Sequence, residues 1–319
     1  MTKFPHRHSL DLNGPDWWFT FKDHAILGAQ TRSDLERAGC VFRPCTVPGN
    51  FELDLQAAGL IEDPFFGMNI AALRQYESTH VWYGRRFTLT EMPDAGEPWL
   101  TFEGIDCFAE IYLNGERIGD ADNMLTVHDF DLRDRLRVDE NELLVHLRPA
   151  VAEAQKYPYP PGAAAFRQSM ESLYVRKAPH MYGWDIMPRA LSAGLWRPVT
   201  LNLRPISRID FAHMETMDAS AGHARLQLRY RAHLPGADFV RDRFEVAVEG
   251  ICGDSRFTVQ DWMIFEAGIL NITVHQPRRW WPRGRGEASL YDITVRLLKN
   301  GVELDCTTFR HGIRTVALV

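Results

Sequence analysis

Alternation of apolar and polar residues with a period of two dominates the last third of the chain. It runs through four short segments: Ala224–Tyr230, Phe244–Val248, Ile269–Val274 and Leu290–Leu298. Successive side chains of a strand point to opposite faces, so this period places the apolar residues on one buried face. Strands at this spacing predict an all-β domain of about 100 residues, immunoglobulin-like in size, that begins near Pro205.

The first two thirds of the chain also consist of short strand-like runs. The clearest signal is Asn114-Gly115, which separates Ala109–Leu113 from Glu116–Ile118. Both turn residues tolerate the positive φ of a type I′ turn, so a β-hairpin is predicted here. Further runs predict a β-sandwich or jelly roll: Trp99–Phe102, Glu142–Leu147 and Val199–Leu203.

Helical signals are few. Asn50 can cap a short helix that ends at Ala58, with Gly59 as the residue that follows the helix. A weaker pattern predicts a second helix over Ala163–Lys177. Between them, Tyr157–Gly162 contains three prolines and is expected to be irregular.

Charge and motif content exclude several classes of function. Lys plus Arg number 36 and Asp plus Glu number 42, giving a net charge of −6, which argues against a nucleic-acid partner. No apolar run reaches the roughly 18–20 residues of a membrane span, and no signal peptide is visible. The five cysteines are scattered and no CxxC pair occurs, which is typical of reduced thiols in the cytoplasm. Without HExxH, GxGxxG or P-loop motifs, we expect neither a metal nor another cofactor.

Nine tryptophans and 11% aromatic residues raise the question of carbohydrate binding. Most of these rings are expected to fill sandwich cores instead. Glycosidases need two carboxyl groups that flank one bond. The one local candidate for such a carboxyl is the Asn141-Glu142 pair, which we interpret as a solvated turn at a strand edge.

Charged and aromatic residues concentrate in Arg176–Pro198, a stretch rich in glycine and proline. Long loops of this composition are often functional. An arginine, a tryptophan and an aspartate together offer a pyranose a donor, a ring face and an acceptor. A structural loop with a buried Asp–Arg pair and a tryptophan in the core is the equal alternative.

The last residues, Thr315–Val319, form a fresh apolar run after a turn. A buried strand needs neighbours for its backbone groups. The run predicts either a last strand of the second domain or the first strand of a third domain.

Several ordered blocks of the chain resemble the N-terminal part of glycoside hydrolase family 2, and within it the exo-β-mannosidases. The similar blocks are Val47–Asn69, Trp82–Phe87, Phe102–Gly119, Arg176–Val199, Trp280–Leu298 and Gly312–Leu318. The resemblance implies a jelly-roll, galactose-binding-like domain over 1–204 and an immunoglobulin-like sandwich over 205–312. It further implies that 313–319 is the first strand of an absent (β/α)8 barrel that carries both catalytic glutamates, so no catalytic residue is expected in this chain.

In the mannosidases that the chain resembles, a loop contributes an arginine, a tryptophan, an aspartate and a second tryptophan to terminal mannose recognition. By resemblance, Arg176, Trp184 and Asp185 are the substrate-binding residues here. The fourth position is Ile186, and Met187 replaces a glycine. The loss of one ring face puts the choice of sugar in question.

Three hypotheses follow. The chain is the N-terminal part of a β-mannosidase-like retaining exo-glycosidase, whose partners are a terminal β-linked sugar and the absent barrel. Alternatively, it is a stand-alone carbohydrate-binding or structural module without hydrolase activity. The departures at Ile186 and Met187 motivate the third, a family 2 enzyme of other specificity, such as a β-galactosidase or β-glucuronidase.

Overall fold

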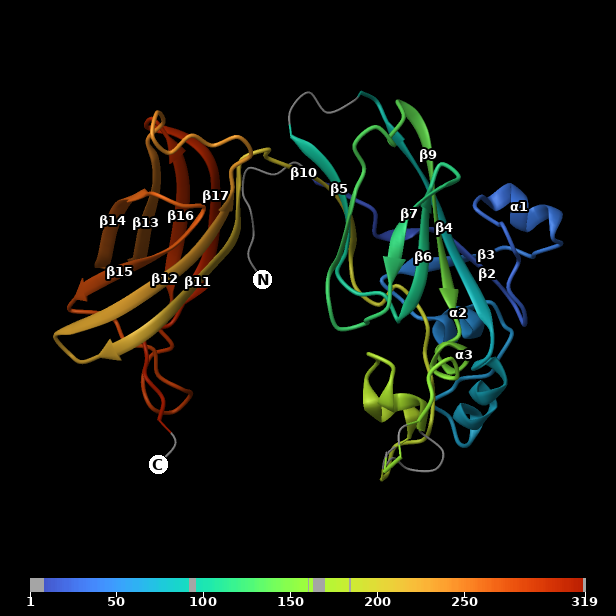
Figure 1. Ribbon diagram of the computed structural model, residues 1–319. Helices are drawn as coiled ribbons and strands as arrows, with labels where there is room; N and C mark the ends of the chain where they lie inside the picture. Colours follow the sequence, from blue (N-terminus) through green and yellow to red (C-terminus); the bar gives the residue numbers. More distant parts are fainter. Residues whose placement is uncertain (1–8, 92–95, 160, 163–169, 184, 318–319) are drawn as a thin grey trace. The chain divides into compact units, whose positions relative to one another are not determined.

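The chain folds into two β-rich units in the computed structural model, which describes residues 9–91, 96–159, 161–162, 170–183 and 185–317 (Figure 1). The N-terminal unit comprises Ser9–Leu203, and the C-terminal unit begins at Arg204. Each unit has its own hydrophobic core. The expected all-β class, with sandwich sheets and little helix, is confirmed.

Two antiparallel sheets build the N-terminal unit. The larger has the strand order β3-β2-β4-β9-β6-β7, and the smaller has the order β1-β10-β5-β8. The strands are β1 (Ser9–Asp11), β2 (Gly14–Lys22), β3 (Arg43–Val47), β4 (His80–Leu89), β5 (Glu97–Phe102), β6 (Phe108–Leu113), β7 (Glu116–Ala121), β8 (His128–Asp131), β9 (Asp139–Arg148) and β10 (Val199–Arg204).

Side chains from both sheets form the core of this unit. Trp17, Phe19 and Tyr83 come from the larger sheet, and Leu100 and Phe102 come from the smaller one. All five are at most 2% exposed. The expectation that tryptophans fill cores holds for Trp17, Trp18 and Trp82, which are buried, whereas Trp262 and Trp281 are exposed.

The C-terminal unit pairs a sheet of order β11-β12-β15 with a sheet of order β14-β13-β16-β17 among the described residues. Its strands are β11 (Arg208–Ala219), β12 (His223–His233), β13 (Phe244–Cys252), β14 (Ser255–Met263), β15 (Ala267–His275), β16 (Tyr291–Lys299) and β17 (Val302–His311). Three plus four strands is the plan of an immunoglobulin-like sandwich. The period-2 pattern has the predicted effect, since Leu226, Leu228, Leu270, Ile272 and Val274 are all buried.

Two local predictions are confirmed. Asn114 and Gly115 have φ values of 54° and 84° and join β6 to β7, as an Asn-Gly hairpin requires. Helix α2 (Phe51–Ala57) begins after Asn50, whose side chain accepts a hydrogen bond from the Leu53 amide. Gly59 follows the helix with a φ of 69°.

The helix expected over 163–177 is wrong in its described part. Residues 163–169 lie outside the described chain, and only the short 3-10 helix η2 (Met170–Leu173) follows. After Tyr174 the chain leaves the helix, and Arg176 makes a single parallel bridge with Asn123. Val175 and Lys177 are buried on either side of the exposed Arg176, the alternation of a bridged strand-like segment and not of a helix.

The run at the C-terminal end forms no strand in its described part, and its assignment as the first strand of a barrel stays a prediction. Ile313 makes one isolated bridge with Arg279, and residues 314–317 belong to no strand. Strand β17 is therefore the last one in the described chain. The apolar run has no strand beside it there to pair its backbone groups.

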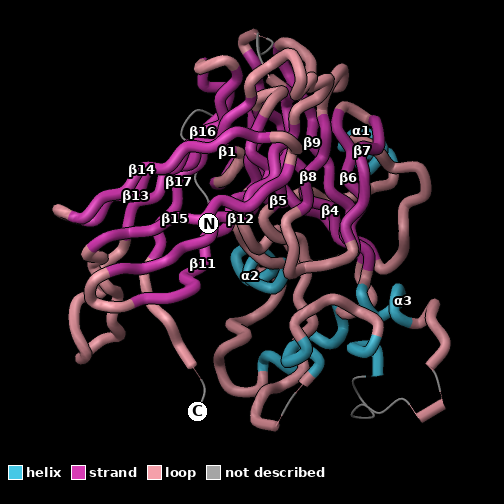
Figure 2. Tube along the Cα trace, turned by 60° about the vertical axis from the view of Figure 1, so that its left-hand side comes forward, coloured by secondary structure: helices cyan, strands magenta, loops and turns pink. Residues whose placement is uncertain are grey.

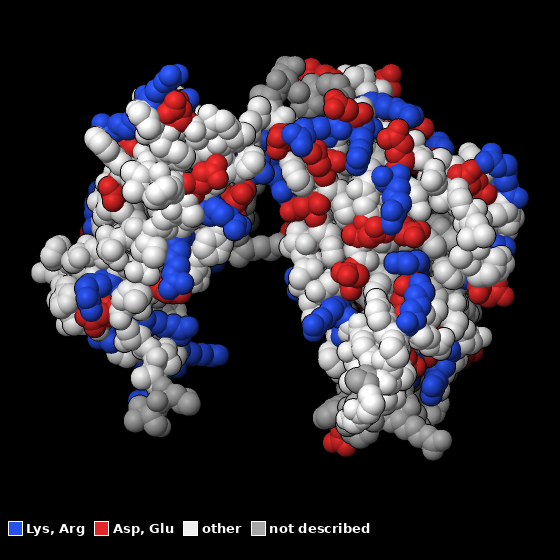
Figure 3. All heavy atoms as spheres, viewed as in Figure 1, with Lys and Arg blue, Asp and Glu red and all other residues white. Residues whose placement is uncertain are grey.

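Short helices supplement the sheets of the N-terminal unit. They are α1 (Arg32–Arg37), η1 (Asn69–Tyr76), α3 (Ala150–Ala154) and η3 (Pro179–Tyr182), besides α2 and η2. Figure 2 shows α2 and α3 toward one end of the strands. None of the helices in the described residues is long and apolar enough to cross a bilayer. On the face drawn in Figure 3, both units carry basic and acidic side chains interspersed.

Candidate functional site

The candidate site is the 176–190 segment, which carries the three residues expected to bind sugar. Arg176 and Asp185 are exposed, and neither side chain has a hydrogen-bond or ion-pair partner among the described residues. Trp184 lies outside the described residues. Ile186 is 89% exposed and Met187 is 47% exposed. The side chains of Arg176 and Asp185 are therefore free to meet a ligand.

A buried ion pair lies directly beside Arg176. The side chain of Lys177 is 0% exposed, and its Nζ lies 2.5 Å from both carboxylate oxygens of Asp106. The same Nζ donates to the carbonyl of Ser192, also at 2.5 Å. Asp106 is held by its backbone, which exchanges hydrogen bonds with Gly194 at 2.9 and 3.2 Å. Lys177 thus joins the start of the segment to the connection between β5 and β6.

A second buried ion pair lies at the other end of the segment. Arg189 donates from Nε and from Nη2 to the two carboxylate oxygens of Glu77, each at 2.8 Å. Both side chains are nearly inaccessible, at 8% and 11% exposed. Nη2 also lies 3.5 Å from Glu171, and the guanidinium lies 5.5 Å from the ring centre of Tyr182. Such a two-pronged pair fixes orientation as well as position.

A third acidic group, Glu52 on α2, contacts the chain just beyond the segment. Ser192 Oγ donates to Glu52 Oε2 at 2.7 Å, while the Ser192 carbonyl accepts from Lys177. Burial raises the pKa of Glu52 to about 7, against a smaller opposing effect from the Ser192 hydrogen bond. Burial also raises the pKa of Asp106, and the Lys177 ammonium opposes that rise.

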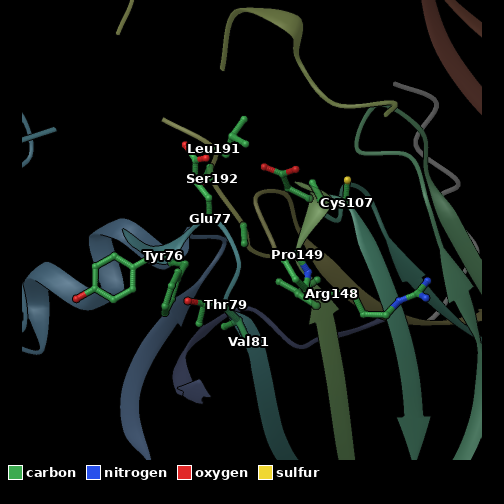
Figure 4. Close-up of a pocket in the computed structure, with 14 residues that line it drawn as sticks. Tyr76, Glu77, Thr79, Val81, Cys107, Arg148, Pro149, Leu191 and Ser192 are labelled. Atoms are coloured by element: carbon green, nitrogen blue, oxygen red, sulfur yellow. The ribbon is translucent and has the colours of Figure 1, made fainter. Parts of the chain in front are cut away.

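Partners of these charged groups, among them Glu77, Asp106 and Ser192, border a small pocket, shown in Figure 4. Its lining includes the polar residues Glu77, Thr79, Asp106, Arg148 and Ser192. The cavity of about 20 Å³ has room for one water molecule and not for a sugar ring. A sugar therefore does not fit this pocket.

The interpretation of the Asn141-Glu142 pair as a solvated turn is wrong, because both residues lie in β9. Asn141 is 0% exposed, and its side chain bonds to the backbone of Arg137 and to Asn114. Glu142 accepts hydrogen bonds from the Arg32 amide and from Arg86. The Asn141 side chain thus ties β9 to the turn between β6 and β7, and the Glu142 side chain ties β9 to α1 and β4. No group of three or more potential metal ligands occurs in the chain as described.

The structural alternative for the segment, a buried Asp–Arg pair with a tryptophan in the core, differs from the pairs that the structure shows. The buried pairs are Lys177 with Asp106 and Arg189 with Glu77, and Asp185 takes no part in them. Trp196 packs at the edge of a smaller core and donates from its indole to the Met124 carbonyl at 3.1 Å. Sequence reasoning named neither Lys177 nor Arg189 as a site residue.

Comparisons with known proteins show which family the domains of the chain resemble. The family "Glycosyl hydrolase 2 galactose-binding domain-like" matches residues 19–197, and "Glycosyl hydrolases family 2" matches residues 214–314. A beta-mannosidase B of Thermothelomyces thermophilus is 32% identical over 278 residues, which cover 85% of this chain and 32% of that protein. A probable beta-mannosidase of Caenorhabditis elegans is 24% identical over 310 residues, which cover 88% and 34%.

A solved structure agrees with these matches. The crystal structure of a beta-D-mannosidase from Dictyoglomus thermophilum superposes with a TM-score of 0.77 at 29% identity. The match covers 98% of this chain and 37% of that one. The chain spans about a third of the length of the curated relatives it matches.

Proposed function

Because this chain belongs to glycosyl hydrolase family 2, we propose that it is the non-catalytic N-terminal part of a β-mannosidase-like retaining exo-glycosidase. The likeness to beta-mannosidases over more than four fifths of the chain carries this proposal. The partners are then a terminal β-linked sugar and a catalytic barrel with two glutamates. Such carboxylates are about 5 Å apart in retaining glycosidases.

In this proposal Arg176, Trp184 and Asp185 recognise the terminal sugar. The exposed and unpartnered side chains of Arg176 and Asp185 support it, because neighbouring charged groups of the segment are consumed in buried pairs. A carboxylate accepts hydrogen bonds from two sugar hydroxyls, and charge-assisted bonds are about twice as strong as neutral ones. Arg176 supplies donors, and Trp184 supplies a ring face along the sugar.

The experiment that tests the proposal uses the gene. We would read the DNA beyond the codon for Val319 and express the full product. We expect an open frame that encodes a barrel with two glutamates. We also expect the full product to hydrolyse nitrophenyl β-mannoside in preference to other nitrophenyl glycosides. Equal or better turnover of the β-galactoside or the β-glucuronide contradicts the mannosidase assignment.

The stand-alone binding module predicts a different result. In that case the 319-residue chain by itself binds mannose, and titration calorimetry at millimolar sugar records heat. We expect no measurable heat, because the segment then supplies only part of a subsite. The variant Asp185→Ala is the matched control, since any heat that survives it comes from elsewhere.

A further inference from the structure

We propose that Lys177 and Arg189 are positioning residues, which clamp the two ends of the 176–190 segment and thereby present Arg176 and Asp185 to the sugar. This inference rests on the proposed function. In this arrangement neither Lys177 nor Arg189 touches the ligand. Each acts through the backbone that carries a contact residue.

The first clamp sets the direction of Arg176. Neighbouring residues in an extended chain point to opposite sides. Val175 and Lys177 are buried and Arg176 between them is exposed, while the Arg176 carbonyl accepts from the Met124 amide at 2.9 Å. All three protons of the Lys177 ammonium have an acceptor, namely the two oxygens of Asp106 and the Ser192 carbonyl. Because Lys177 is held inward, Arg176 faces outward.

The second clamp closes the part of the segment that carries Asp185. The Ala190 amide donates to the Met181 carbonyl at 2.9 Å, so residues 181 to 190 form a closed loop. Arg189 lies at the base of this loop and is tied to Glu77, the residue that ends η1. Gly183 has a φ of 95°, and a Cβ there would meet Arg189 at 3.5 Å. The loop base is therefore packed and directionally bonded.

The chemistry of the clamps favours positioning over stability. A buried ion pair gains little net stability over apolar packing, but removing one partner leaves an uncompensated buried charge. The pairs therefore serve as directional ties between distant parts of the chain. Lys177 lies 71 positions from Asp106, and Arg189 lies 112 positions from Glu77.

The first test measures hydrogen–deuterium exchange on the 319-residue chain. The double variants K177M/D106N and R189M/E77Q remove each pair without leaving a buried charge, so the fold is expected to survive. Amides of the 181–190 loop should exchange at least about tenfold faster in R189M/E77Q, while those of β2, β4 and β9 keep their rates. Arg133→Met, which breaks an exposed ion pair with Glu97, is the control and should change neither region. The inference is overturned if the loop amides of R189M/E77Q exchange at the wild-type rate. It is also overturned if the exchange rates rise equally in the loop and in the sheets.

The second test uses the full-length product and compares the clamp variants with Asp185→Ala. We expect kcat/KM on the mannoside to fall at least about tenfold in both double variants, mainly through KM, and Arg189→Lys to restore it only in part. If Asp185→Ala lowers kcat/KM and the clamp variants do not, the clamps are not positioning residues. If Asp185→Ala itself leaves kcat/KM unchanged, the proposed sugar contact fails, whatever the exchange rates show.

Discussion

The imidazole of His146 lies flat on the indole of Trp82, with ring centres 4.5 Å apart and planes within 5° of parallel. The two residues are directly opposite each other on β9 and β4. Glu110, opposite His146 on β6, lies 3.2 Å from its Nδ1, and His80 Nδ1 lies 2.9 Å from its Nε2. His80 lies two positions before Trp82 on β4, and its ring stacks on that of His146, so the larger sheet contains a stacked and hydrogen-bonded pair of histidines.

This pair predicts a loss of stability in mild acid. Burial, and next the charge of His146, lower the pKa of His80 from 6.5 to about 4. The unfolded chain then binds a proton that the folded chain refuses, so stability is lost as the pH falls from 6.5 toward 4. In His80→Asn this loss should be smaller by about 1 kcal/mol, because the side chain is half-buried and solvent screens part of the effect. Urea unfolding at pH 7 and pH 4.5 measures it.

The exposed His223 provides the control for that experiment. His223→Asn should leave the difference in unfolding free energy between pH 7 and pH 4.5 at the wild-type value. An identical difference in His80→Asn and in the wild type would show that His80 titrates normally in the folded chain.

Glu52 predicts an effect of opposite sign. Its pKa is raised from 4.5 to about 7, so the folded chain holds the proton longer than the unfolded one. Stability from this group is present below pH 4.5 and is lost as the pH rises toward 7. Glu52→Gln keeps an acceptor for Ser192. It should raise the unfolding free energy over that of the wild type by up to about 3 kcal/mol more at pH 8 than at pH 5. Unfolding at both pH values tests this, with the exposed Glu62→Gln expected to show no such change.

Gly84 allows a close approach in the larger sheet. A Cβ at this position would lie 2.0 Å from Cζ2 of Trp18, its cross-strand neighbour. Gly84→Ala should therefore lower the unfolding free energy by about 2 kcal/mol or more, because the ring has to move out of a packed cluster. Gly222→Ala, with nothing within 4 Å of the added Cβ, should change it far less. Equal melting temperatures for both variants would contradict the prediction.

Ile186 bears on the choice of sugar. It occupies the position where the mannosidases that this chain resembles carry a tryptophan, and it is 89% exposed, so a larger ring displaces no core. Ile186→Trp in the full-length product should raise kcat/KM on nitrophenyl β-mannoside by up to about tenfold, through the added ring face. Ile186→Leu is the control. If kcat/KM falls in Ile186→Trp, or rises equally in Ile186→Leu, the added ring face takes no part in sugar recognition.

The sequence by itself determined the local architecture of this protein. Alternation predicts the strands of the C-terminal unit, Asn114-Gly115 predicts the hairpin, and Asn50 with Gly59 bounds α2. These signals succeed because each depends on the backbone and on near neighbours. The expected helix over 163–177 failed where the structure describes it, because extended pairing near Arg176 overrode a weak local pattern.

Only the tertiary structure decided which charged residues are buried. The sequence showed Lys177, Arg189 and Asp185 as equal members of one polar stretch. Folding brings Asp106 to Lys177 and Glu77 to Arg189, and it leaves Asp185 exposed. A charged side chain is buried only where a partner distant in the sequence compensates it, and no local pattern specifies that partner.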